Sequence, residues 1–181
     1  RKDVVGAMPD YKVVSDTLVY DTDDEMMYFY GPTTIYNKEN ILLGNYGWYN
    51  TETELAYLDR RATLKNKEQT MTADTMYYNK KTGYAKALSD VILEDTTYKA
   101  VVRGEFAEIW RNEGKCMMTN NLRGFYYEEI DTLFAIADTV YVYFDTLSND
   151  IQRIKAFYNV RFFRNDIQGK CDSLHYNVAD S

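Results

Sequence analysis

The stretch Ala73-Asp74-Thr75-Met76-Tyr77-Tyr78-Asn79 decides how this chain folds, because it returns along the whole sequence. Its copies, four clear and two weaker, lie at 15–21, 45–50, 73–79, 105–110, 137–143 and 171–177. An acidic or amide residue marks each copy, and successive marks are 29, 29, 31, 33 and 34 residues apart: Asp16, Asn45, Asp74, Glu105, Asp138 and Asp172. A spacing this regular is typical of one supersecondary unit used repeatedly, so the sequence predicts an array of repeats.

The composition of the chain favours β structure. Its 181 residues include 18 Tyr and 8 Phe but only 2 Pro, and aromatic residues are enriched in strands. We expect a single all-β domain over residues 1–181, a length that allows a sizeable core. No apolar run in the sequence reaches the roughly 18 residues that a membrane-spanning helix needs.

Polar clusters rich in Asp, Asn, Gly, Lys and Thr divide each repeat into two segments. They recur from 21–25 through 79–83 to 164–166, at short intervals along the chain. Connections this short join neighbouring strands that run antiparallel. The sequence therefore predicts an antiparallel meander of about eleven strands, each of about 10 to 13 residues.

The alternation of apolar and polar residues predicts which face of each strand is buried. In the even-numbered strands one parity is apolar, as at Met27 and Phe29, and the other carries charges such as Lys86. In the odd-numbered strands the apolar parity, as at Met76, also includes the marking residue, here Asp74. We therefore expect the marking residues on the inner face of the sheet, near its rim.

Glycine and proline in the middle of strands indicate where the sheet bends. One continuous apolar face cannot be covered by a flat single sheet, so the sheet must fold over on itself. Mid-strand Gly marks a bend, and mid-strand Pro breaks a ladder. The expected creases are Gly31-Pro32, Gly44 with Gly47, Gly104 and Gly124.

The repeated phrase Ala-Asp-[Ser/Thr]-Leu-x-Tyr-[Asp/Asn] resembles the OstA-like (LptA-like) family of lipopolysaccharide-transport domains. Strands that follow it, Asp90-Val91-Ile92-Leu93 and Asn159-Val160-Arg161-Phe162, add to the resemblance, which covers about Val14 to Asn177. It implies a V-shaped, taco-like β-jellyroll, which agrees with the folded meander. It also implies a periplasmic protein of Gram-negative outer-membrane biogenesis, and lipopolysaccharide or a similar amphiphilic lipid as ligand. Further implied partners are other Lpt-type β-jellyroll domains, or a second copy, bound head-to-tail through edge strands.

An apolar trough would carry the acyl chains of lipid A by keeping them out of water, at roughly 0.8 kcal/mol for each CH₂ group. The alternative is that the same side chains only fill a sandwich core. The trough candidates are the inner-parity residues Met27, Phe29, Ile35, Tyr49, Leu58, Leu64, Met76, Tyr78, Val91, Leu93, Met118, Leu122, Val140, Val142, Val160 and Phe162.

The six marking residues have two interpretations. Six inward polar groups in a dry core would be costly, so they either contact sugar hydroxyls or metal-bridged phosphates at the mouth, or bond backbone N–H groups at strand bends. Arg60 also falls on the inner parity. It either pairs with a marking residue or faces lipid phosphate, unless a shifted register places it outside.

The sequence carries no catalytic motif. The one histidine, His175, lies on the outward parity, and neither a Gly-x-Ser-x-Gly phrase nor a glycine-rich phosphate loop is present. We predict no enzyme, no cofactor and no metal site, and a net charge of −7 argues against nucleic-acid binding. Two other functions stay open: a carbohydrate-binding sandwich, which Trp48 and Trp110 would suit, and a purely structural assembly module.

Cys116 and Cys171 are expected to be free thiols. The register places Cys116 on the inner parity of the eighth strand and Cys171 on the outer parity of the eleventh. Three strand spacings separate them by roughly 14 Å, whereas a disulfide needs Cα atoms within about 7 Å. Because the chain begins at Arg1 and not Met, we also expect its start to be a processed or trimmed end.

Overall fold

The computed structural model describes residues 4–8, 11–38, 40–127 and 131–178 of the chain. Nearly all of them lie in one antiparallel sheet, and the single-turn 3₁₀ helix η1 (Arg111–Glu113) lies between two strands. The strands are β1 (Val4–Met8), β2 (Tyr11–Asp21), β3 (Met26–Asn37), β4 (Ile41–Asn50), β5 (Leu55–Asp59), β6 (Ala62–Lys65), β7 (Gln69–Ala73), β8 (Thr75–Asn79), β9 (Tyr84–Asp95), β10 (Ala100–Trp110), β11 (Lys115–Tyr127), β12 (Thr132–Phe144), β13 (Ile151–Arg164) and β14 (Ile167–Asn177).

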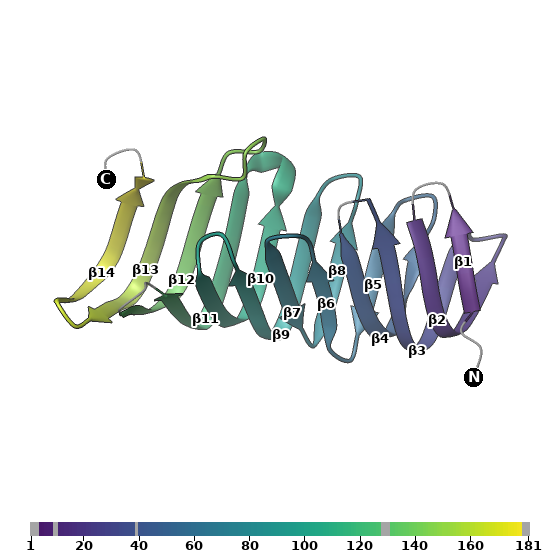
Figure 1. Cartoon of the computed structure of the whole chain (residues 1–181), viewed down its shortest axis with the longest axis horizontal. Helices are drawn as coiled ribbons and strands as arrows, with labels where there is room; N and C mark the ends of the chain where they lie inside the picture. The colour runs from purple at the N-terminus through teal and green to yellow at the C-terminus, as the bar shows by residue number, and fades with distance from the viewer. Residues whose placement is uncertain (1–3, 9–10, 39, 128–130, 179–181) are drawn as a thin grey trace.

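The strands follow one another in chain order along an elongated sheet, with β1 at one end and β14 at the other (Figure 1). Strands β5 and β6 are two halves of one bent strand, as are β7 and β8, so the pairing closes a ring β4-β5-β8-β9-β7-β6. The predicted all-β antiparallel meander is confirmed. It has fourteen strands instead of about eleven, because two long strands are interrupted and β1 precedes the first repeat.

Each long strand bends at mid-length, where two residues of one strand oppose one residue of the next. Ser89 and Asp90 of β9, for example, both have left-handed φ angles and oppose the single residue Glu105 of β10. Asn120 and Asn121 of β11 oppose Asp138 of β12 in the same way. These are β-bulges, which bend a strand and increase its twist, and Asn and Asp tolerate left-handed φ better than most residues.

The marking residues of the repeat are therefore the bend residues, and the expectation that they face inward is wrong. A bulge of one residue shifts the alternation by one, so the inner parity switches at each mark. In β2, Val13 and Ser15 are buried before Asp16, whereas Leu18 packs against the core after it. Four of the six marking residues are exposed: Asp74, Glu105, Asp138 and Asp172.

The expected creases are correct in part. Gly31, with φ of 93°, and Pro32 do form the bend of β3, and Gly44 and Gly104 lie directly before the bends at Asn45 and Glu105. The crease at Gly124 is wrong, because β11 bends at Asn120 and Asn121. Arg60 also lies at a bend and is exposed, which agrees with the alternative of a shifted register that places it outside.

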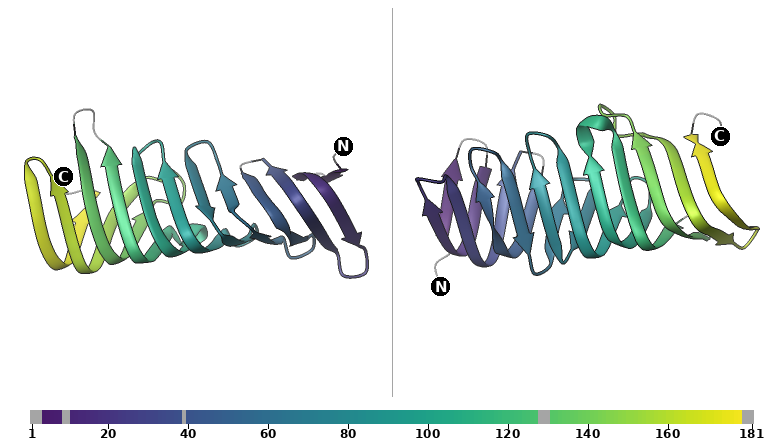
Figure 2. Two further views of the ribbon diagram at one scale, coloured as in Figure 1. Left: turned by 90° about the horizontal axis from the view of Figure 1, so that it is seen from below. Right: turned by 180° about the vertical axis from the view of Figure 1, so that it is seen from behind.

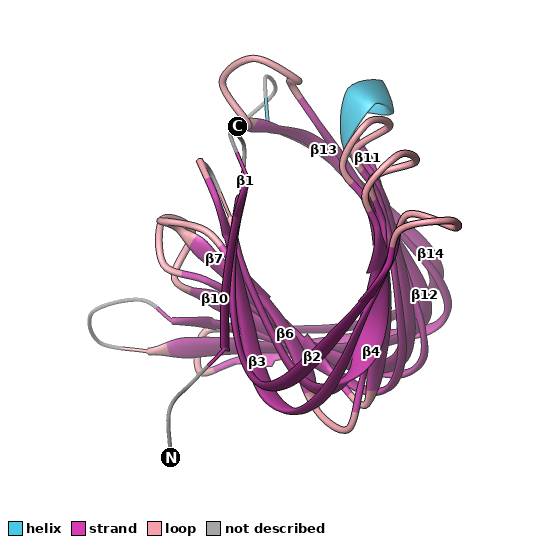
Figure 3. Ribbon diagram, turned by 90° about the vertical axis from the view of Figure 1, so that its right-hand side faces the viewer, coloured by secondary structure: helices cyan, strands magenta, loops and turns pink. Residues whose placement is uncertain are grey.

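The bends fold the sheet into two facing walls, which a view along the molecule shows as a U-shaped section (Figure 3). The other views show the strand segments side by side along the length of each wall (Figure 2). Wall A contains 4–8, 11–15, 33–37, 41–44, 62–65, 69–73, 91–95, 100–104, 122–127, 132–137, 160–164 and 167–171. Wall B contains 17–21, 26–30, 46–50, 55–59, 75–79, 84–88, 106–110, 115–119, 139–144, 151–157 and 173–177.

The core lies between the walls and is uneven along the molecule. From β2 to β11 one large cluster of buried side chains fills the interior, with Phe29, Leu58 and Met76 fully buried. The buried cluster of β12 and β13 is small and consists of Ala137, Ala156 and Val160. The interior is thus tightly packed in the N-terminal part and thinly filled in the C-terminal part.

The two cysteines are free, as expected, and lie three strands apart in β11 and β14. The expected outward direction of Cys171 is wrong, because the bulge at Asp172 switches the parity of β14. Cys171 instead packs against Ala137, Ala156 and Val160 inside the fold. Burial raises the pKa of the Cys116 thiol from 9.0 to about 12.

We predict two titratable thiols in the oxidised protein, of which Cys116 reacts slowly. Because the thiolate is the reactive form, the alkylation rate of Cys116 in a Cys171→Ser variant should rise about tenfold for each pH unit, with no plateau below its raised pKa. The Cys116→Ser variant is the control that reports Cys171 alone. An intramolecular disulfide in the mass spectrum, or a plateau for Cys116 near pH 9, would contradict this placement.

Candidate functional site

All sixteen trough candidates lie on the inner faces of the two walls. Ten of them are buried, with exposed fractions of 5% or less: Met27, Phe29, Ile35, Tyr49, Leu58, Met76, Val91, Met118, Leu122 and Val160. Leu64, Tyr78, Leu93 and Val140 are partly buried against the large cluster. Val142 and Phe162, which lie two residues beyond Val140 and Val160 on the same faces, are also only partly buried.

Glycines make room for the large inner side chains. A Cβ atom on Gly47 would lie 2.8 Å from the Phe29 ring, and one on Gly104 would lie 2.9 Å from Cγ of Met118. A side chain on Gly169 would overlap the ring of Phe162. The interior is therefore shaped by pairs of a glycine and a bulky neighbour. Sequence reasoning interpreted Gly47 and Gly104 only as bends and did not consider Gly169.

A small cavity remains in the N-terminal part, where the free ends of the walls meet. Its volume is about 10 Å³, close to the space of one water molecule, so no acyl chain fits there. Tyr11 packs edge-on against Tyr49 across it, with ring centres 4.9 Å apart. The lining residues are Tyr11, Ile35, Asn37, Leu42, Tyr49, Ala56, Tyr78 and Lys80.

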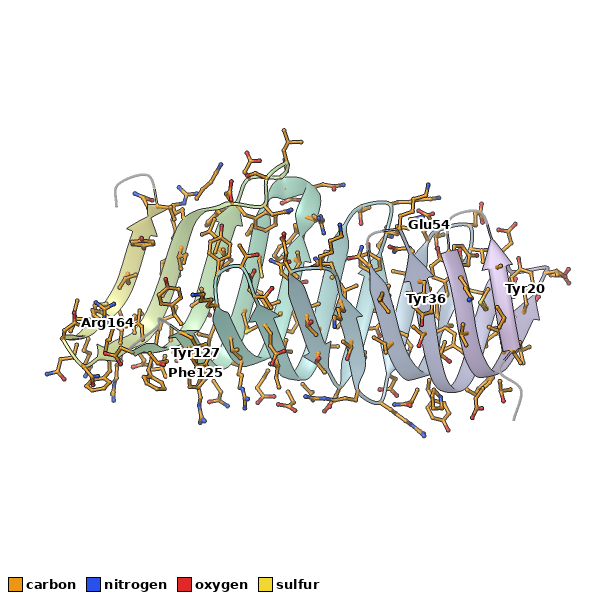
Figure 4. All side chains as sticks on the ribbon, in the orientation of Figure 1. Tyr20, Tyr36, Glu54, Phe125, Tyr127 and Arg164 are labelled. Atoms are coloured by element: carbon orange, nitrogen blue, oxygen red, sulfur yellow. The ribbon has the colours of Figure 1, made fainter. Side chains whose placement is uncertain are left out.

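Tyr11 is held neutral at this closed end. Burial, followed by the charges of Tyr20, Glu54 and Glu25, raises its pKa from 10.0 to about 12. Tyr20 and Glu54 lie near the β1 end of the sheet (Figure 4). The phenol of Tyr11 thus contributes apolar contact and a neutral hydroxyl, not charge, to the closed part of the interior.

In the C-terminal part the inner face is apolar but partly exposed. The buried positions there are Ala137, Ala156 and Val160, and the side chains of Val142 and Phe162 remain half-buried. Tyr176, which follows Leu174 on the inner parity of β14, is 45% exposed. The lining that is packed from β2 to β11 becomes accessible to solvent between β12 and β14.

Hydrogen bonds join the walls along the seam between their free ends. The hydroxyl of Tyr98, in the turn of wall A between β9 and β10, accepts a bond of 2.8 Å from the backbone N–H of Ile151 in wall B. Nearer the N-terminus, Asn40 donates to the hydroxyl of Tyr78 over 3.5 Å. These contacts close the seam at two places, one near the N-terminus and one where the turn before β10 in wall A meets the start of β13 in wall B.

The marking residues connect neighbouring bends instead of lining the mouth. Glu105 accepts a bond of 3.3 Å from the backbone N–H of Asp90, and the Asn45 side chain donates to the backbone carbonyl of Arg60 over 2.7 Å. The Glu105 bond is the expected contact with a backbone N–H group at a bend, whereas Asn45 contacts a backbone carbonyl there. The expected position near the rim is wrong, because the bends lie at mid-strand, away from the free ends of the walls.

The aromatic residues on the outer face of wall B pack in cross-strand rows. Trp48 stacks on Tyr57 at 6.0 Å between ring centres, and Trp110 lies beside Tyr84 and under the ammonium group of Lys115. Neighbouring side chains thus occupy faces of both indoles. Such pairs stabilise a sheet, and they account for these residues without a sugar ligand.

The described residues give little indication of other kinds of site. Within the described ranges, His, Cys, Asp and Glu form no group of three or more that could hold a metal ion. His175 lies outward, with its ring centre 5.8 Å from that of Phe157. No helix among the residues that the structure describes is long and apolar enough to cross a membrane.

A comparison with protein families agrees with the resemblance seen in the repeat. Residues 1–74 match the model of the family described as OstA-like protein, which is less than half of the chain. A crystal structure of LptH, the LptA homologous periplasmic component of the conserved lipopolysaccharide transport device from Pseudomonas aeruginosa, is similar at 12% identity and a TM-score of 0.29, over 78% of this chain and 80% of that one. Curated protein sequences give no match.

Because the core is packed unevenly, the same Leu→Ala substitution should lower the stability of the protein by different amounts in its two parts. Leu58→Ala, in the packed part, should lower the free energy of unfolding by about 2 to 5 kcal/mol. Leu174→Ala, the same change on the half-buried inner face of β14, should cost about 1 kcal/mol, because its methyl groups are partly in water already. Urea denaturation measures both values, and equal losses would show that the C-terminal interior is as tightly packed as the rest.

Proposed function

We propose that this chain is a non-catalytic periplasmic carrier that binds acyl chains of lipopolysaccharide, or of a similar amphiphilic lipid, between β12 and β14. The observation that carries the proposal is the apolar inner face, which runs unbroken along the molecule and becomes partly exposed in that region. The OstA-like match of residues 1–74 supports it. A Gram-negative periplasm is the location that this family implies.

The proposal divides the sixteen trough candidates into two groups. Val140, Val142 and Phe162 are only partly buried, and Val160 lies in the small buried cluster beside them, so these four would contact lipid. The remaining candidates from β3 to β11 hold the walls together. Each CH₂ group buried against the first group would contribute roughly 0.8 kcal/mol, so about four such groups supply roughly 3 kcal/mol of binding energy.

The two end strands of the sheet support assembly with other β-jellyroll domains. Among the described residues, β1 pairs only with β2, and β14 pairs only with β13. Edge strands present free N–H and C=O groups to which another strand can be added. We therefore propose head-to-tail assembly, either with a second copy or with related β-jellyroll domains, so that the apolar interiors of successive domains are aligned.

Photocrosslinking tests the carrier proposal directly. A photoreactive residue at Val142, on the inner face, should label lipopolysaccharide, whereas one at Tyr141, the outward neighbour on the same strand, should not. A third position, Phe29 in the packed part, should also stay unlabelled. Equal labelling from 142 and 141 would remove the carrier proposal, and labelling from 29 alone would move the site to the other end.

Light scattering tests the assembly proposal. The mass of the parent protein in solution should increase with concentration. Alternate N–H groups of an edge strand face outward, so one of the two variants Val5→Pro and Gly6→Pro should remove an outward donor and reduce association. Val5→Ser, which keeps the N–H group, is the control. A parent protein that stays monomeric at millimolar concentration would contradict the proposal.

A further inference from the structure

The outer face of wall A carries a row of cations at its C-terminal end. Across β10 to β14 the register places Arg103 opposite Arg123, Arg123 opposite Ile136, Ile136 opposite Arg161, and Arg161 opposite Lys170. All four charged side chains are exposed. With neighbouring strands about 4.8 Å apart, the row is roughly 19 Å long.

These cations lack carboxylate partners. In the described part of the chain, no ion pair joins any of the four to an acidic residue. Glu94, opposite Val101, is an exposed acid on the same outer face. Two acidic bend residues are engaged elsewhere: Glu105 with the N–H of Asp90, and Asp138 with the side chain of Asn159. Like charges directly opposite each other destabilise a sheet, so the Arg103–Arg123 pair has no evident structural benefit.

A row of phenylalanines lies beside the cations on the same face. Phe125 is opposite Phe134, and Phe134 is opposite Phe163. Phe125 and Phe134 pack edge-on at 5.5 Å, yet Phe134 is 45% and Phe163 is 52% exposed. Phe125 lies near the lower edge of the sheet together with Tyr127 (Figure 4). Exposed aromatic groups that adjoin one another are typical of an interaction surface.

The basic row is confined to one half of wall A. The same outer row in the N-terminal half consists of neutral residues, Val14, Thr34, Leu43, Thr63 and Thr72. The chain as a whole has a net charge of −7. The basic row is therefore a local departure from both its own wall and the overall charge.

We propose that this face, the basic row with the phenylalanine row, docks on a bilayer surface that contains anionic phospholipids. Guanidinium groups bind phosphate in two-pronged geometry, and the phenylalanine rings would enter the interface between headgroups and acyl chains. A nucleic acid or an acidic protein would match the charges alone, whereas a bilayer also takes up the aromatic row. The inference goes beyond lipid carriage, which concerns the opposite, inner face of the same strands.

Co-flotation with vesicles tests the docking surface. The full chain should bind vesicles of phosphatidylcholine mixed with phosphatidylglycerol, should not bind vesicles of phosphatidylcholine alone, and should be released by high salt. Each Lys or Arg near an anionic surface contributes about a fivefold gain in affinity, so Arg123→Gln with Arg161→Gln should weaken binding about 25-fold. The matched control, Lys12→Gln with Lys65→Gln, makes the same charge change in the N-terminal half of wall A and should leave binding unchanged.

A separate variant tests the contribution of the phenylalanine row to vesicle binding. Phe163→Ser should weaken binding and keep the salt dependence of the parent protein, because it removes apolar contact and no charge. Absence of binding to the anionic vesicles would overturn the inference, as would equal losses in the two double variants. Binding to a polyanion such as heparin, without binding to vesicles, would assign the row to another class of partner. The inner-face labelling at Val142 is independent of all these outcomes.

Discussion

The bulge at the middle of each long strand is the constraint on which the rest of the structure depends. At each bulge two residues oppose one, as Ser89 and Asp90 oppose Glu105, and the strand turns there by enough to bring its two halves face to face. Because the bulges of neighbouring strands lie side by side, the bends align into one crease along the molecule. The crease creates two walls from one sheet, and only then does a single apolar face become an enclosed interior.

Much of this arrangement is readable from the sequence, because the repeat spacing, the short turns and the alternation at Met27 and Phe29 are local signals. The direction of the marking residues is not, because a period-2 test assumes an uninterrupted ladder. A one-residue bulge breaks that assumption. A signal was present all the same: Val13 and Ser15 have one parity and Leu18 has the other, so the apolar parity changes at Asp16. The misplaced direction of Cys171 has the same cause, since Asp172 is a bend residue of the same kind.

The difference between the packed and the accessible part of the interior is a tertiary property. Phe29 and Phe162 both have apolar neighbours two residues away, and the alternation gives them equal weight as trough residues. What separates them is the size of the side chains opposite. Phe29, Leu58 and Met76 meet in one cluster, whereas the centre of the C-terminal cluster is built from Ala137 and Ala156. The basic row is likewise a tertiary property that the net charge of the chain does not predict. Arg103, Arg123 and Arg161 are aligned across strands by the register of the sheet and not by composition.

The two halves of the molecule depend on each other through stability. Apolar surface that stays in water contributes little to folding, so a domain built only from segments such as β12 to β14 would be marginal. The large cluster from β2 to β11 supplies the burial that this segment lacks, and the continuous ladder joins both parts in one sheet. Since alternate residues face opposite ways, Val160 and Phe162 line the thinly filled interior while Arg161 and Phe163 face outward between them. The segment from β2 to β11 thus acts as the folded base that allows both faces of β12 to β14 to remain partly exposed.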